Sequence, residues 1–511
     1  MVCNISNRPI LIACRTPPPE PLPMRFTPFL FLPFALFLAA ASASASPPQA
    51  SPNILLIFAD DQRADTIGAW GNPFIDTPNI DQIAKSGMSF RRTYCMGSMH
   101  GAVCVPSRAM LHTGRDYHGL DVSNFEGCRT MGEVLGAAGY TTFGTGKWHN
   151  GKGTFQRSFQ SGNSIMFSGM SNHREVPLTD LAEGEYTKQR TGNAHSSELF
   201  ANAAIEFLNG YESEDPFFCY LAFSAPHDPR DPPRPYAERY YDRRPPLPRN
   251  FLPQHPFDNG MLVLRDENLG AWPRTEELVA DQLAEYYGII THMDEQLGRV
   301  LAALEATGKA DNTIVIYAAD HGLALGSHGL LGKQSLYEHS MRAPLIIAGP
   351  GIPEGASSTA LTYLFDLYPT LLGLAGTQGD LDIEGRNLAN IWKGESEGVR
   401  DSIFLSMKNT QRAVTDGRWK LIRYPAIDMT QLFDLASDPD ELLNLAGRPE
   451  HGKRVAELWK ELQRWQAQIG DDLPLHVDEP GEPFVDLTNT PRKPDRWQPL
   501  WIRKKYFEEQ D

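Results

Sequence analysis

Three apolar segments that each end in polar residues constrain the fold of this chain more than any other feature. They read "NILLIFADD", "PFFCYLAFSAPH" and "NTIVIYAADHG", and they begin at residues 53, 216 and 312. Short, uninterrupted apolar runs of this kind are typical of strands that are buried on both faces of a parallel sheet. Amphipathic stretches such as "SSELFANAAIEFLNG" and "LAEYYGIITHMDEQLGRVLAALEATG" lie between them. The alternation predicts an α/β protein in which helices cover both faces of a large, mostly parallel mixed sheet.

The pattern changes near residue 400. The segments "DSIFLSMKN", "RAVTDGRWKLIRY" and "QLFDLASDPDELLNLA" predict short antiparallel strands, with a hairpin turn at Asp416-Gly417. The stretch "HGKRVAELWKELQRWQAQIG" then predicts an amphipathic helix. We therefore expect a main domain over residues 50–398 and a smaller C-terminal α+β lobe with a tail over residues 399–511. Residues 229–275 are rich in Pro and Arg, and a loop of this length is usually functional or disordered, with a solvated surface excursion as the plain alternative.

The N-terminal residues predict a signal peptide. "MRFTPFLFLPFALFLAAASASA" begins at Met24 with one arginine, continues through an apolar stretch and ends in A-x-A steps. We interpret residues 1–45 as a leader, with Met24 as the true start and residues 1–23 as a gene-prediction extension. The chain is therefore expected to be periplasmic or secreted, and no later segment predicts a membrane span. A net charge of −16 without a basic stripe argues against nucleic-acid binding.

Four cysteines lie outside the predicted leader, which is too few for a disulfide scaffold. Cys95 and Cys128 are one possible disulfide pair, and Cys219 lies in an apolar run typical of a buried thiol. Cys104 differs because it stands in "CVPSRAMLHTGR", beside residues that a structural cysteine does not need. Pro106 suits the first turn of a helix, whose N-terminal amides would stabilise an anion.

The polar ends of the three apolar segments predict the position of a site. They carry Asp60-Asp61, His227 and Asp320-His321, and functional residues of open α/β sheets gather at the carboxyl ends of strands. Three carboxylates repel one another unless a divalent cation lies between them. Oxygen ligands favour Ca²⁺ or Mg²⁺, whereas His321 would also suit Mn²⁺ or Zn²⁺. The remaining candidates for this site are Arg108, Lys147, His149 and Lys333. Cations around a metal suit a doubly coordinated anion such as sulfate or phosphate.

The cysteine segment also resembles a known family. "CVPSRAMLHTGR" is similar to the signature of type I sulfatases, C-x-P-S-R followed by x-x-L-x-T-G-R. Further segments resemble that family in the same order, over roughly residues 50 to 450: "NILLIFADDQRAD", "GYTTFGTGKWH", "FFCYLAFSAPHDP", "AADHGLALGSHGLLGKQSLYEHSMRAPLIIAGPG" and "LFDLASDPDELLNLA". The resemblance implies an alkaline-phosphatase-like fold. One departure is His321, where many members have asparagine, and here the chain resembles iduronate-2-sulfatase-like and choline-sulfatase-like branches.

The resemblance implies a mechanism. In type I sulfatases a maturation enzyme oxidises the signature cysteine to formylglycine, whose hydrate attacks sulfur with one hydroxyl and expels sulfate after deprotonation of the other. The implied catalytic residues are Cys104, Arg108, Lys147, His149, His227 and Lys333. The implied metal ligands are Asp60, Asp61, Cys104, Asp320 and His321, and they bind Ca²⁺ in preference to Mg²⁺ or Mn²⁺. His149 would be the base, His227 and Lys333 would protonate the leaving alcohol, and Arg108 and Lys147 would neutralise sulfate oxygens.

The expected substrate is a sulfated polysaccharide or its oligosaccharides, and the expected partner is the formylglycine-generating maturation enzyme. Three alternatives remain open at this point. The first is a phosphonate monoester or phosphodiester hydrolase of the same superfamily. The second is a choline-sulfatase-like enzyme for small molecules, and the third is a binding protein that has lost catalysis. His328, close behind the second metal segment, is a further residue that we expect to touch substrate.

Overall fold

The computed structural model describes residues 51–379, 383–487 and 494–507, and these ranges form one compact unit. The predicted leader, residues 1–45, lies outside the described residues. Among the helices of the described ranges, none combines the length and the apolar character that crossing a membrane requires.

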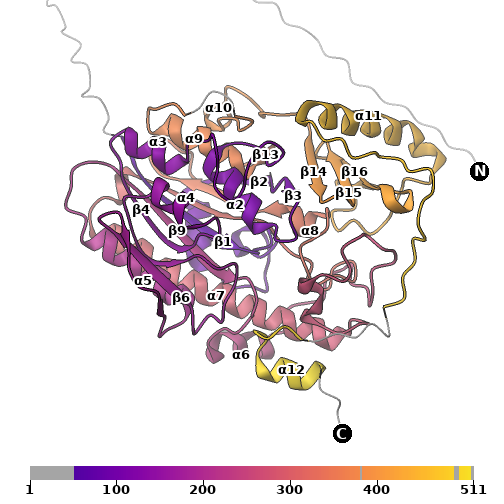
Figure 1. Ribbon diagram of the computed structural model, residues 1–511, viewed down its shortest axis with the longest axis horizontal. Coiled ribbons are helices and arrows are strands. Elements are labelled where there is room, and N and C mark those ends of the chain that lie inside the picture. The colour runs from indigo at the N-terminus through magenta and orange to yellow at the C-terminus, as the bar shows by residue number, and fades with distance from the viewer. Residues whose placement is uncertain (1–50, 380–382, 488–493, 508–511) are drawn as a thin grey trace, which may run out of the picture. The chain divides into compact units, whose positions relative to one another are not determined.

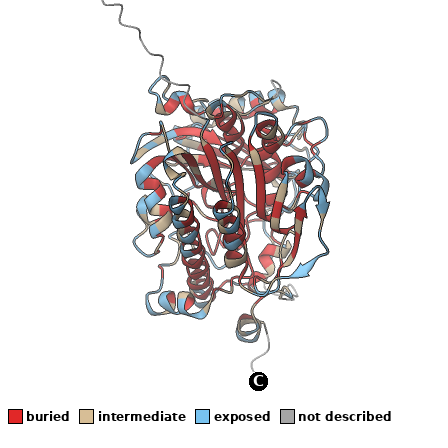
Figure 2. Ribbon diagram, turned by 90° about the vertical axis from the view of Figure 1, so that its left-hand side faces the viewer, coloured by how far each residue is buried: buried red, intermediate tan, exposed pale blue. Residues whose placement is uncertain are grey.

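Four parallel strands form the centre of a 12-stranded sheet. Side by side, they are β10 (Thr313–Ala319), β1 (Asn53–Asp60), β9 (Phe217–Pro226) and β4 (Thr141–Lys147). The three apolar segments of the sequence are therefore neighbouring parallel strands, as predicted. Every residue of β1 and β9 is buried, and Figure 2 shows the strands of the sheet mostly in red. Because the four strands are parallel, their carboxyl ends lie at one edge of the sheet.

Shorter strands extend the sheet on both sides and make it mixed. On one side β12 pairs antiparallel with β10, and on the other β5 pairs parallel with β4. The outer strands are β2 (Gly87–Tyr94), β5 (Ser161–Met166), β6 (Pro177–Ala182), β7 (Glu185–Tyr186), β8 (Arg190–Thr191), β11 (Arg342–Ala343), β12 (Leu345–Ala348) and β13 (Ala356–Tyr363).

Helices cover both faces of the sheet (Figure 1). Successive side chains of a strand point to opposite faces, so both faces of the apolar strands present hydrophobic side chains to helices. Leu55 and Ile57 of β1 belong to the apolar cluster that includes α5 and α7, whereas Leu56 and Phe58 belong to the cluster that includes α2, α3 and α9. The bounds of the helices are α1 (Pro78–Ser86), α2 (Cys104–Thr113), α3 (Met131–Ala137), α4 (Lys152–Ser158), α5 (Ser196–Asn209), α6 (Arg234–Asp242), α7 (Glu276–Ala306), α8 (Glu338–Met341), α9 (Leu367–Leu374), α10 (Ala389–Trp392), α11 (Gly452–Ile469) and α12 (Leu500–Tyr506).

A second, smaller sheet follows near the C-terminus, as the sequence predicts. Strands β14 (Ile403–Met407), β15 (Gln411–Thr415), β16 (Trp419–Tyr424) and β17 (Met429–Asp434) are antiparallel, and the β15–β16 hairpin turns at Asp416-Gly417. Helix α11 packs on β15 and β16 (Figure 1). The fifth strand of this sheet comes from the N-terminal half of the chain, because β3 (Gly97–Ser98) pairs with β14. The small sheet is thereby tied to the segment that leads into α2.

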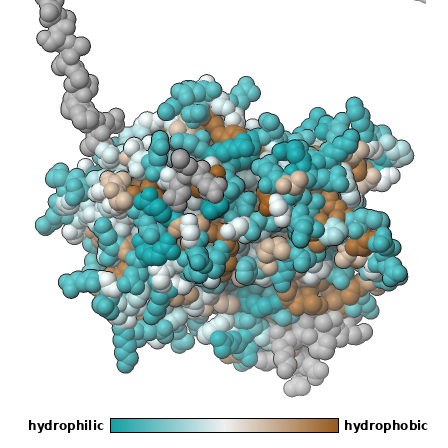
Figure 3. Space-filling view, turned by 45° about the horizontal axis from the view of Figure 1, so that its top comes forward, coloured by the Kyte–Doolittle hydropathy of each residue, from teal (hydrophilic) through white to brown (hydrophobic). Residues whose placement is uncertain are grey.

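The four described cysteines are buried and free, so Cys95 and Cys128 are not bridged. Cys219 lies in β9 with none of its surface exposed, in agreement with its predicted role as a core thiol. Hydrophilic side chains cover most of the face in Figure 3, and the hydrophobic ones form separate small patches.

Candidate active site

The central strands deliver polar side chains to one edge of the sheet. The residues at these strand ends, or directly after them, are Asp60, Asp61, Lys147, His149, His227, Asp320 and His321. Their position is that of ligand sites in open α/β sheets, outside the carboxyl ends of parallel strands. All but His149 are buried.

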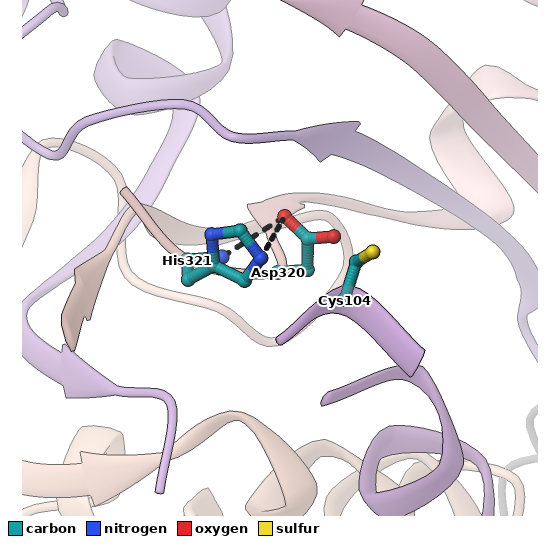
Figure 4. A group of neighbouring side chains, drawn as sticks. All are labelled: Cys104, Asp320 and His321. Carbon is teal, nitrogen blue, oxygen red and sulfur yellow. Dashed lines mark hydrogen bonds and ion pairs between the residues drawn. The ribbon is translucent and has the colours of Figure 1, made fainter. Parts of the chain in front are cut away.

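Helix α2 brings Cys104 to this edge. Cys104 is the first residue of α2, and its Sγ lies 3.3 Å from Nδ1 of His149 and 3.8 Å from Nζ of Lys147. The hydroxyl of Ser107 donates to the main-chain oxygen of Asp320 at 2.9 Å, which fixes the first turn of α2 against the end of β10. Figure 4 shows the Cys104 side chain next to the Asp320 carboxylate. A group bound at Cys104 therefore meets a helix N-terminus and a lysine together.

Arg108 lies one turn further along α2 and has no exposed surface. It donates to Oδ2 of Asp60 at 2.6 Å and to the main-chain oxygen of Lys147 at 2.7 Å, and it lies 3.6 Å from Oδ2 of Asp320. Nζ of Lys147 also contacts Oδ2 of Asp60, at 2.6 Å. The same arginine thus holds the ends of β1 and β4 together, which requires a planar, multidentate cation.

Asp61 organises the opposite side of the site. Nζ of Lys333 lies 2.8 Å from its Oδ1, Nε2 of His227 lies 3.7 Å from its Oδ2, and Nδ1 of His321 lies 3.4 Å from its Oδ1. Burial lowers the pKa of His321, but the carboxylates of Asp320 and Asp61 outweigh burial and raise it to about 9. The site is therefore one continuous network of alternating charges.

The charges shift the pKa values of the central groups. Burial alone would raise the pKa of the Cys104 thiol, but the positive charge of Lys147 contributes most to holding it well below its usual value. Burial also opposes ionisation of Asp60, whose pKa Lys147 and Arg108 nevertheless lower strongly. The pKa of Asp320 is instead raised to about 6, by burial and by the neighbouring negative charge of Asp60.

Local backbone conformation aims two of these side chains. Asp61 has φ of 65° and His149 has φ of 69°, a left-handed conformation that non-glycine residues rarely adopt outside constrained sites. Gly146 precedes Lys147 with φ of 90°, and a Cβ atom there would lie 1.8 Å from the main-chain oxygen of Ala222. The end of β4 consequently requires glycine at position 146.

The donor set fits a divalent cation. Oδ1 of Asp60, Oδ2 of Asp320 and Nε2 of His321 are buried and have no hydrogen-bond partner within the described part of the chain. Ligand atoms of Cys104, Asp320 and His321 lie within 4.8 Å of one another, and so do those of Asp60, Asp61 and His227. Buried polar atoms without partners are costly, and a cation bound between them would satisfy them once His321 has lost its proton. Oxygen donors with one imidazole suit Ca²⁺, Mg²⁺ or Mn²⁺.

The Pro- and Arg-rich segment 229–275 is packed near the candidate site at its two ends, whereas many residues between 234 and 256 are exposed. It contains α6 and a 3₁₀ helix at Arg265–Leu269. Arg265 pairs with Asp228, whose main-chain oxygen lies 2.8 Å from Nδ1 of His227. The carboxylate of Glu267 accepts from the N–H of Gly332 at 2.8 Å, immediately before Lys333. This segment therefore orients two of the predicted site residues.

Sequence reasoning missed Asp228, Arg265 and Glu267. Asp228 directly follows His227, and that adjacency is the only signal that could have revealed it. No periodic pattern or motif distinguishes Arg265 and Glu267 from the other charged residues of their segment.

His328 has a different position from the one we expected. Its ring stacks on Tyr337 with 3.9 Å between ring centroids, and its Nε2 lies 3.0 Å from the main-chain oxygen of Glu441. Burial lowers its pKa to about 4. His328 therefore packs against Tyr337 and the main chain of Glu441, and these contacts are not with residues of the candidate site.

Comparisons with known proteins match most of the chain. The family model described as Sulfatase matches residues 52–377, and the model described as N-sulphoglucosamine sulphohydrolase, C-terminal, matches residues 326–468. The chain is 30% identical to an arylsulfatase of Clostridium perfringens, over 80% of this chain and 93% of that protein. It is 27% identical to an N-acetylglucosamine-6-O-sulfatase of Bacteroides thetaiotaomicron, over 87% of this chain and 92% of that protein. A solved structure in complex with its substrate D-glucosamine-2-N,6-O-disulfate has a TM-score of 0.71 at 24% identity, over 84% of this chain and 100% of the other.

Proposed function

Because this chain belongs to the sulfatase family and is a sulfuric ester hydrolase, we propose that it hydrolyses sulfate esters of carbohydrates after conversion of Cys104 to formylglycine. The observation that carries this proposal is the position of Cys104. It begins α2 at the carboxyl edge of the sheet, 3.3 Å from His149 and 3.8 Å from Lys147. Cys104 is free, and it is not a member of the three apolar clusters found in the described part of the chain.

Carbohydrate is the proposed substrate class. The relative from Bacteroides thetaiotaomicron is an N-acetylglucosamine-6-O-sulfatase, and the matched solved structure holds a sulfated glucosamine. We further propose that the chain is exported to the periplasm or secreted, since residues 1–45 have the pattern of a signal peptide. A formylglycine-generating enzyme would act on Cys104 as its partner in maturation.

The proposed reaction needs two groups besides the standard side chains, which are formylglycine at position 104 and a divalent cation. Formylglycine supplies, as its hydrate, one hydroxyl for attack on sulfur and a second whose deprotonation releases sulfate. A divalent cation, with Ca²⁺ proposed before Mg²⁺ or Mn²⁺, would supply positive charge for sulfate oxygens and would make the hydroxyl of residue 104 more acidic. Asp60, Asp61, Asp320 and His321 would hold it together with residue 104.

The remaining chemistry belongs to the chain's own side chains. Nδ1 of His149 takes a proton from the side chain at position 104, from which it is one hydrogen bond away. Nζ of Lys147 neutralises sulfate oxygens beside the same side chain, and so does Arg108, which also holds Asp60 and the end of β4 in place. On the opposite side, His227 and Lys333 donate a proton to the leaving alcohol oxygen.

A panel of esters tests the proposed reaction. Fully matured enzyme is expected to release free sulfate from at least one sulfated glycan, with kcat/KM well above that for an aryl phosphodiester. Ion chromatography of released sulfate and phosphate measures both rates. A faster reaction on the phosphodiester would instead support a phosphodiester hydrolase, and no reaction on any sulfate ester would contradict the proposal.

Replacing His227 by alanine is expected to lower kcat on a sugar sulfate by about 10²-fold or more, because general acid catalysis contributes that much to difficult leaving groups. The loss on an aryl sulfate should be smaller, since a phenolate leaves without full protonation. Steady-state kinetics on both esters measures the difference. His476→Ala, at a side chain that is 68% exposed, is the matched control. Equal losses on both esters would contradict the role of His227 as an acid.

A further inference from the structure

A hollow of about 560 Å³ lies between the C-terminal segment 494–507 and two loops of the sheet edge. The residues that line it include Asn172, Pro229, Arg496, Trp497, Trp501 and Lys504. Residues 494–507 lie beyond residue 468, where the matched family models end. The hollow is thus formed in part by a segment that neither family model covers.

Both loops that line the hollow also border the candidate site. Pro229 lies two residues after His227. Asn172 lies three residues after Gly169, where a Cβ atom would come within 2.4 Å of Nε2 of His149. Nε2 of His173 lies 3.0 Å from the main-chain oxygen of His227 and joins the two loops. A ligand in the hollow would therefore contact the two loops that lie against His149, the proposed base, and that carry His227, the proposed acid.

The C-terminal segment is fixed to this place by charge. Nε of Arg265 lies 3.1 Å from Asp495, the residue directly before Arg496, and Nη1 lies 3.1 Å from Oδ1 of Asp228. Asp228 in turn accepts through its main-chain oxygen at Nδ1 of His227. Asp495, Arg265 and Asp228 thereby link the tail to the site.

The lining has the chemistry of a site for an acidic sugar. Trp497 and Trp501 are partly exposed, and Arg496 and Lys504 are exposed. Within the described ranges, neither Arg496 nor Lys504 forms an ion pair with a carboxylate, although the chain carries a net charge of −16. Asp231, the acidic residue of the lining, is already paired with Arg174 at 3.2 Å. The guanidinium of Arg496 lies over the ring of Trp497, 4.5 Å from its centroid, and Trp501 lines the same hollow. Aromatic rings beside cations that no carboxylate neutralises suit a sugar that carries an anionic substituent.

We propose that this hollow is the subsite for the sugar that adjoins the sulfated one, and that it takes an acidic pyranose bearing a carboxylate or a second sulfate. This inference rests on the proposed function, since it assigns the substrate's second unit to the same site. Trp501 packs on the ring, and Arg496, which lies over Trp497, binds the anionic group together with Lys504. The binding energy of this second sugar then lowers the barrier for hydrolysis of the sulfate ester on the first sugar.

Kinetics of the Arg496→Ala/Lys504→Ala double variant tests the subsite. For the oligosaccharide that the wild type desulfates best, we expect KM to rise at least tenfold. A small aryl sulfate, which is too short to reach the hollow, should be affected far less. Lys453→Ala, at a 91% exposed lysine on α11, is the control for removal of surface charge. Equal effects on both substrates, or no effect on either, would overturn the subsite.

A binding measurement separates failure of the subsite from failure of the proposed function. Titration calorimetry compares Cys104→Ala protein with Cys104→Ala protein that also carries the double substitution. The probe is the best-desulfated oligosaccharide or, if wild type releases no sulfate, a heparin-derived tetrasaccharide. At least fivefold weaker binding to the triple variant supports the subsite even when no turnover occurs. Equal binding, including no binding to either protein, overturns it.

Discussion

Replacing Cys104 by alanine is expected to lower sulfate release by more than about 10⁴-fold, because it removes the group that would attack sulfur. The folded structure should persist. Cys104 is 2% exposed, and alanine keeps its Cβ and favours the first turn of α2. Ion chromatography of sulfate from matched preparations measures the loss, and a thermal melt checks the fold. Binding of substrate should remain, which would separate a catalytic residue from a structural one.

The matched control is Cys128→Ala, the same chemical change at another buried, free cysteine. It is expected to leave kcat within a factor of about two, with a modest loss of stability. Peptide mass adds an independent reading, since formylglycine at position 104 makes its peptide about 18 Da lighter than the cysteine form. A Cys104→Ala protein that keeps a tenth of wild-type turnover would contradict the proposed nucleophile, and so would a turnover-competent enzyme whose peptide mass is unchanged.

The central strands, and the gathering of polar residues at their carboxyl ends, were predictable because both depend on local pattern. A buried parallel strand has an uninterrupted apolar run, and its last polar residue marks the carboxyl end. Asp60, His227 and Asp320 could therefore be placed at one edge before any contact was known. The structure brings the remaining predicted residues to the same edge, including Cys104 through α2 and Lys333 through its contact with Asp61.

What the sequence could not predict depends on contacts between distant segments. Glu267 receives the N–H of Gly332, 65 residues away, and no periodicity records such a pairing. The positive φ of Asp61 and His149 is equally invisible, since both residue types are ordinary at strand ends. His328 shows the converse error, because closeness in sequence to Asp320 does not place its ring in the site when stacking on Tyr337 holds it elsewhere.

Chelation of divalent cations is expected to abolish sulfate release and to lower Tm, with Ca²⁺ restoring both. The buried atoms Oδ1 of Asp60, Oδ2 of Asp320 and Nε2 of His321 have no hydrogen-bond partner within the described ranges, so a bound cation would satisfy all three. A cation at 100 times its Kd stabilises the folded state by about 2.7 kcal/mol, which corresponds to a Tm shift of a few degrees. Differential scanning calorimetry with and without chelator measures this shift independently of turnover.

Asp320→Asn is expected to lower the apparent affinity for Ca²⁺ by at least about tenfold, because a neutral amide replaces one charged ligand. The affinity is read from the rise of Tm with Ca²⁺ concentration. Asp311→Asn is the matched control, since Asp311 precedes β10 and lies beyond its opposite end. Its response to Ca²⁺ should equal that of the wild type. If chelator and Ca²⁺ leave the Tm and the activity of wild-type protein unchanged, the carboxylates of Asp60, Asp61 and Asp320 do not hold a cation. Arg108, Lys147 and Lys333 must then balance their charge alone.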